Sequence, residues 1–185
     1  MALASEKGFP QFVALGMIMR GWALAVQGQG EEGITQLHQR LAAFRAAGAE
    51  ISRSRDLALL AEAYGEMGQT EEGLTVLAEA LAVADKTGER YWEAEMHRLK
   101  GELLLRQASP FEEVEAYFRQ AIEIARDQQA KSLELRAATS LSRLWQRQGK
   151  RTEAHGLLAP IYGWFTEGFD TTDLQEVKAL LDALA

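Results

Sequence analysis

The stretch Ala61-Glu62-Ala63-Tyr64-Gly65-Glu66-Met67-Gly68, followed by Glu71-Glu72-Gly73-Leu74, decides the fold because its pattern returns along the chain. The pattern is a small residue, a large apolar residue three positions on, a glycine four after that, another small residue, and then apolar positions. The residues that open the copies are Gly21, Ala61, Gly101 and Ser142, so the steps are 40, 40 and 41 residues. A fixed period in this range predicts a solenoid of stacked units.

Each copy has the features of a helical hairpin. Leu74, Leu77, Ala78 and Leu81 fall at i, i+3, i+4 and i+7, which is one apolar helix face. The turns at 28–30, 68–70 and 149–151 are short, which favours antiparallel neighbours, whereas the third copy has an extra residue and no glycine there. We therefore expect an all-α, right-handed solenoid of about four helical hairpins plus a C-terminal capping helix.

The period also predicts the organisation of the chain as one domain over residues 1–185. We expect helices at 10–27, 31–47, 51–67, 71–87, 90–106, 110–128, 132–148, 151–165 and 172–184. The repeats would be 10–50, 51–89, 90–130 and 131–168, with 1–9 as the remnant of a preceding helix and 170–185 as the capping helix. The remnant is inferred because Ala2-Leu3-Ala4 aligns with Ala80-Leu81-Ala82, and a frayed leader is the alternative. In the first case an apolar face with Phe12, Leu15 and Met19 would be exposed, which predicts self-association through the N-terminal edge.

Composition limits the function classes. No run approaches the roughly 18 apolar residues of a membrane span, and no signal-peptide pattern is visible, so we expect a cytoplasmic protein with no membrane contact. The absence of cysteine excludes disulfides and thiolate metal sites. The net charge of −7 argues against nucleic acid as a partner, and only the arginines of the fourth unit keep that alternative open.

The small and apolar pattern resembles the tetratricopeptide repeat over most of residues 10–165, in units about six residues longer than the usual length of about 34. That resemblance implies a scaffold that binds a protein or peptide. Three segments, at 15–25, 91–104 and 162–171, are similar to the C-terminal repeat arms of large bacterial adenylate/guanylate cyclase and AAA/STAND ATPase signalling proteins. The narrower resemblance implies an interaction or regulatory arm, whose partner could be another domain of the same polypeptide. A stand-alone peptide-binding adaptor is the alternative.

Catalytic constellations are missing from the sequence. His38, His97 and His155 lie in different units and have no metal-ligand spacing. The pairs Glu71-Glu72 and Glu112-Glu113 open helices, where acidic residues favour the helix dipole. No Walker motif or cyclase motif occurs. We therefore expect no enzyme, no metal and no cofactor.

The resemblance also implies a binding groove, because the first helix of each tetratricopeptide hairpin lines the concave face. Transferred by position, the groove residues are Trp22, Arg55, Glu62, Glu66, Glu95, Arg98, Glu102, Arg106, Arg136, Arg143 and Arg147. One interpretation is a solvated face with i,i+4 pairs such as Arg98 with Glu102. The other is a groove for an acidic segment, since arginine suits carboxylates. Chaperone-type carboxylate clamps depend on asparagine, which this chain lacks.

Overall fold

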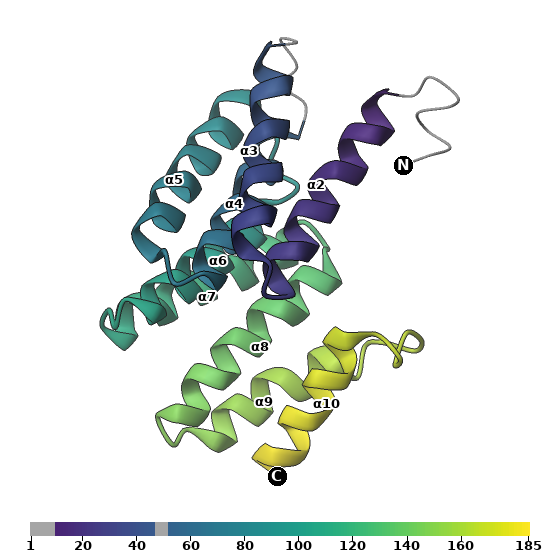
Figure 1. The fold of residues 1–185 in the computed structure, drawn as a ribbon. Helices are drawn as coiled ribbons and strands as arrows, with labels where there is room; N and C mark the ends of the chain where they lie inside the picture. The colour runs from purple at the N-terminus through teal and green to yellow at the C-terminus, as the bar shows by residue number, and fades with distance from the viewer. Residues whose placement is uncertain (1–9, 47–51) are drawn as a thin grey trace. The chain divides into compact units, whose positions relative to one another are not determined.

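The computed structural model describes residues 10–46 and 52–185, and the regular structure in these ranges is helical throughout (Figure 1). The helices are α2 (Pro10–Val26), α3 (Gly30–Ala46), α4 (Arg53–Glu66), α5 (Thr70–Thr87), α6 (Glu93–Arg106), α7 (Phe111–Asp127), α8 (Lys131–Arg147), α9 (Arg151–Tyr162) and α10 (Thr172–Leu184). The all-α hairpin prediction is confirmed. Most bounds shift by one to three residues. The largest shifts are at the start of the helix expected at 90–106 and at the end of the helix expected at 151–165, which ends two residues after Pro160. The helix remnant expected at 1–9 lies outside the described residues.

The turn within each hairpin contains a residue in the left-handed backbone conformation, with positive φ. Gly28, Gly68 and Gly149 have φ of 87°, 73° and 76°, a conformation that glycine adopts without steric cost. In the third hairpin the same place is taken by Ala108, with φ of 58°. The missing glycine therefore leaves the backbone path unchanged and places a side chain in an unfavourable conformation.

The chain divides into two compact units, residues 1–90 and 91–185. In the first unit, α2 and α3 form one hairpin, α4 and α5 form the next, and α4 packs against both helices of the first hairpin. A Cβ atom at Gly33 would lie 2.5 Å from the Gly21 carbonyl oxygen, so the backbones of α2 and α3 touch at these glycines. Ile18, Leu37 and Leu60 fill the core between the hairpins.

The second unit repeats this plan with the hairpins α6–α7 and α8–α9, and then adds α10. The Phe118 ring lies where a side chain at Gly101 would be, 2.5 Å from that Cβ position. Helix α10 packs against α8 and α9, and it occupies the place that the first helix of a further hairpin would take. Its buried stripe is Leu174, Val177, Leu180 and Leu184.

Candidate interaction surface

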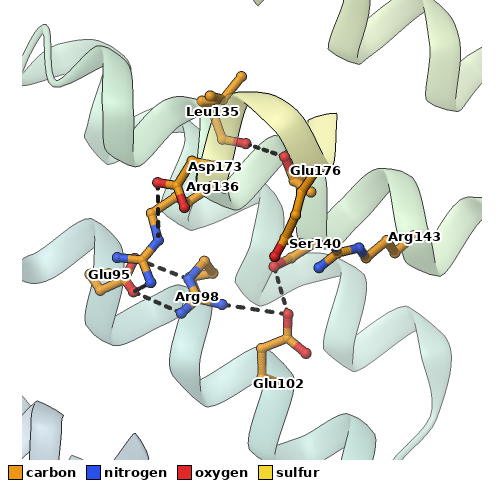
Figure 2. A network of polar contacts seen from close by, with 10 residues as sticks. Glu95, Arg98, Glu102, Leu135, Arg136, Ser140, Arg143, Asp173 and Glu176 are labelled. Atoms are coloured by element: carbon orange, nitrogen blue, oxygen red, sulfur yellow. Dashed lines mark hydrogen bonds and ion pairs between the residues drawn. The ribbon is translucent and has the colours of Figure 1, made fainter. Parts of the chain in front are cut away.

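Four of the expected groove residues of the second unit contact one another and Ser140, which was not expected there. We define this polar ladder as Glu95, Arg98, Glu102, Arg136 and Ser140 (Figure 2). Glu95 is buried at its centre. Arg98 donates to both Glu95 carboxylate oxygens, from Nε at 3.0 Å and from Nη2 at 2.7 Å. Arg136 Nη2 lies 3.0 Å from Glu95 Oε1. Because Glu95 and Arg136 are equivalent residues of α6 and α8, this ion pair ties two successive first helices together.

The ladder continues on either side of this centre. Ser140 Oγ donates to Glu102 Oε1 at 2.6 Å, and Arg98 Nη1 lies 3.5 Å from the same oxygen. The expected pairing of Arg98 with Glu102 is therefore confirmed. This second contact between α6 and α8 lies about two helical turns further along α6 than the first.

Helix α10 adds carboxylates that the sequence analysis did not assign to the surface. Arg143 Nη2 donates to Glu176 Oε2 at 2.7 Å, and Arg136 Nε lies 4.0 Å from Asp173 Oδ2 (Figure 2). The repeat period contains a signal for this contact, because Glu176 follows Arg136 by 40 residues and so falls at the equivalent position. Three of the expected arginines of the second unit, Arg98, Arg136 and Arg143, thus already face carboxylates of that unit.

Charge keeps the ladder ionised although its centre is buried. Burial by itself would raise the pKa of the Glu95 carboxyl, but the charges of Arg98 and Arg136 and the hydrogen bonds from Arg98 outweigh it and hold that pKa below its usual value. A buried carboxylate that accepts several charged donors stabilises a structure only while it is deprotonated. The ladder therefore depends on pH in the acid range.

Two of the expected groove arginines lie at the C-terminal ends of their helices. Arg106 is exposed at the end of α6, and Arg147 is exposed at the end of α8. The structure records no ion pair or hydrogen bond of Arg147 with the other residues that it describes. Arg143 and Arg147 therefore lie one helical turn apart on α8 as two exposed cations.

In the first unit, equivalent residues of the two first helices also contact each other, but through a hydrogen bond from a tryptophan and not through an ion pair. Trp22 Nε1 of α2 donates to Glu62 Oε2 of α4 at 2.6 Å, and the two residues are equivalent, 40 positions apart. Arg55 Nη2 donates to Asp56 Oδ1, on its own helix, at 2.8 Å. Glu66 is exposed at the end of α4.

A buried ion pair beside this face was missed by the sequence analysis. Arg40 Nη2 of α3 lies 3.7 Å from Asp56 Oδ2 of α4, and both side chains are almost fully buried. The positions equivalent to Arg40 hold Ala80, Ala121 and Ile161, all in the core. Burial raises the pKa of Asp56, against the opposing effect of Arg55 and Arg40, and burial lowers the pKa of Arg40. Nε and Nη1 of Arg40 have no acceptor among the described residues.

Stacked hairpins tied through equivalent residues of their first helices define a helical-repeat scaffold. Residues 53–127 match the family model of the tetratricopeptide repeat. Crystal structures of nearly identical TPR-like repeats, from a Podosopora anserina protein assigned to the kinesin light chains, are similar to this chain. One superposes with a TM-score of 0.66 at 20% identity over 91% of this chain and 83% of its own. The Q17M form gives 0.67 at 19% identity over the same shares. The fold is therefore TPR-like.

A sequence relative is a much longer chain. An uncharacterized protein of Rhizobium meliloti (strain 1021) is 32% identical over 128 residues, which are 69% of this chain and 12% of the relative. The aligned part is thus about an eighth of that protein. Among residues 10–46 and 52–185, no three acidic or histidine side chains gather as a metal site, and no helix is long and apolar enough to cross a membrane.

Proposed function

We propose that this chain is a non-catalytic, cytoplasmic scaffold module that holds a protein segment, as the C-terminal repeat arm of a longer bacterial signalling protein of the ATPase or cyclase type. The TPR-like fold supports the scaffold role, because such repeats generally mediate contacts between proteins. The long-chain context is supported by the resemblance of segments 91–104 and 162–171 to such arms. The size of the Rhizobium meliloti relative is consistent with it.

The accessible pair Arg143 and Arg147 is the observation that carries the binding role. The Arg143–Glu176 ion pair leaves about half of each side chain exposed, and ion pairs of this kind contribute little to stability. A carboxylate of a partner can therefore replace Glu176 on Arg143 at small cost, while Arg147 offers a second guanidinium one turn away. An acidic protein segment fits this chemistry.

Binding of a defined acidic peptide tests the role of the arginines. A fluorescein-labelled, glutamate-rich helical peptide should bind the wild-type chain, and its lysine-rich counterpart should not. The double substitution Arg143→Glu with Arg147→Glu should weaken binding at least tenfold, by roughly 1.4 kcal/mol or more. Lys86→Glu with Lys178→Glu changes the net charge equally at two exposed lysines and serves as the control. Equal weakening in both variants would mean that only net charge matters.

The competing functions have their own readouts. An antibody raised against this chain should detect a polypeptide far larger than 20.5 kDa in cells of the source organism. A native product near that mass would instead support a stand-alone peptide-binding adaptor. Tighter binding of duplex DNA or RNA than of the acidic peptide would favour the nucleic-acid alternative. Self-association through the N-terminal edge would be a separate contact, which sedimentation measurements would detect.

A further inference from the structure

One side chain at a core position of the repeat is exposed. Met19 of α2 has an exposed fraction of 44%, whereas the equivalent residues Leu59, Ser140 and Leu180 have 7%, 5% and 8%. Leu59 belongs to the core formed with α2 and α3. Ser140 and Leu180 lie on helices that pack against the hairpin before them. Met19 therefore differs from its equivalents in having no hairpin against its face among the described residues.

The same helix is apolar where the other first helices carry charge. Leu15 of α2 is exposed, and its equivalents include Arg55, Glu95 and Arg136. In the second unit, Glu95 and Arg136 form the ion pair that links successive first helices. A helix stacked on α2 in the same register would thus meet Leu15 and would need an apolar residue opposite it.

We propose that the face of α2 formed by Leu15 and Met19 is a docking surface for a helical hairpin of the same repeat type. The hairpin would stack on α2 in the register in which α2 and α3 stack on α4. This continues an interface that the first unit already contains. That the same polypeptide supplies this hairpin rests on the proposed function of the chain as an arm of a longer protein.

The buried Arg40–Asp56 ion pair indicates which residue a hairpin docked on α2 must carry at the Arg40 position. In the existing stack, Arg40 of α3 needs the carboxylate of Asp56 on the next first helix. The residue of α2 equivalent to Asp56 is Gly16, which offers none. A hairpin with arginine at the Arg40 position would therefore bury an unpaired charge, which is strongly unfavourable. The partner hairpin carries a small apolar residue there, as the second unit does with buried Ala121 and Ala137.

This requirement argues against a second copy of α2–α3 as the occupant, because it would bring its own Arg40 against Gly16. The occupant is a hairpin with the chemistry of α6–α7, in which Ala121 takes the place of Arg40. A chain that supplies its own α6–α7 hairpin in front of α2 can therefore test the proposal. Residue 131 is equivalent to residue 10, since Arg136 is equivalent to Leu15. Residues 91–130 can thus be joined directly to Pro10 in place of residues 1–9.

Thiol labelling reports whether the added hairpin covers Met19, because the chain has no cysteine of its own. In the unextended chain, Met19→Cys should react fast with a maleimide, and Leu59→Cys should react at least about tenfold more slowly. In the extended chain, with Glu95→Leu in the added copy to face Leu15, Met19→Cys should slow to the rate of Leu59→Cys. Fast labelling of an extended chain whose helicity shows the added hairpin to be folded would overturn the proposal.

Two matched variants test the charge requirement. Ala121→Arg in the added hairpin should restore fast labelling of Met19→Cys. Adding Gly16→Asp should slow labelling again, because it recreates the Arg40–Asp56 pair. If Ala121→Arg leaves labelling slow, the proposed partner chemistry is wrong.

Measurements on the full chain remain decisive if the extended chain fails to fold. Met19→Glu should leave the melting temperature almost unchanged, whereas Leu59→Glu should lower it strongly. An equal loss in both variants would overturn the proposal, since Met19 would then be a core residue. A dimer that Met19→Glu abolishes would identify a second copy as the occupant and contradict the hairpin. A short native polypeptide would refute only the proposed arm, because none of these readouts depends on native length.

Discussion

At the scale of single residues, absent side chains set the distance between the helices of a hairpin. Gly33→Ala should destabilise the chain by about 1–3 kcal/mol, as overpacking does, because its Cβ would lie 2.5 Å from the Gly21 carbonyl oxygen and 2.8 Å from the Ala25 nitrogen. These are backbone atoms and cannot turn away. Gly156→Ala is the control, since its Cβ meets no atom within 4 Å and alanine favours a helix by about 0.5–1 kcal/mol. Urea denaturation should show opposite signs for the two variants, and a loss in both would contradict the packing argument.

The turn residue Ala108 offers the reverse experiment. Its φ of 58° is a conformation that glycine holds at the equivalent places in the other hairpins. Ala108→Gly should therefore stabilise the chain by up to about 1 kcal/mol, the usual size of such left-handed strain. Gly149→Ala, at φ of 76°, should destabilise it by a similar amount. Thermal melting that shows no gain for Ala108→Gly would mean that the unfolded-state entropy of the new glycine cancels the relief.

At the scale of helices, the polar ladder predicts an acid-sensitive contact between α6 and α8. The pKa of Glu95 lies below its ordinary value of 4.5 in the folded chain, so its stabilisation is present above that pH. The stabilisation is lost as the pH falls through the lowered pKa. Glu95→Gln should thus destabilise the protein at neutral pH and reduce the loss of stability in acid. Urea denaturation at several pH values measures both effects, with Glu112→Gln, an exposed residue, as control. Parallel pH profiles of wild type and Glu95→Gln would contradict the assignment.

The helices and their order follow from local chemistry, which is why the sequence could predict them. Apolar residues at helical spacing and a turn glycine act within one hairpin, and α5 or α8 could be placed to within a residue. The contact partners of the charges depend on how hairpins stack, and they were harder to predict. Arg143 looks like a free surface charge until α10 brings Glu176 to it. Arg40 looks equally ordinary, although comparison with Ala80 and Ala121 marks its position as core.

At the scale of the whole molecule, the two units differ in the residues that they bury where their two hairpins stack. The junction of α2–α3 with α4–α5 buries Arg40 and Asp56 at positions where the junction of α6–α7 with α8–α9 holds Ala121 and Ala137. Removing one partner of a buried ion pair leaves an unpaired charge, which costs about 3–5 kcal/mol, whereas replacing both with apolar residues is often neutral or stabilising.

A double-mutant cycle at Arg40 and Asp56 tests this difference. Arg40→Met and Asp56→Leu should each destabilise the chain by about 3–5 kcal/mol, and the combined variant should be near wild type, because neither of the two most deeply buried charges then remains and Arg55 keeps partial access to solvent. Arg55 limits the cost of Arg40→Met, since it also donates to Asp56, so Asp56→Leu should be the worse single change. Urea denaturation of the four proteins gives the coupling energy. If the stability loss of the combined variant equals the sum of the two single losses, Arg40 and Asp56 act independently. An arginine at the Arg40 position would then not need a carboxylate at the Asp56 position of the next hairpin.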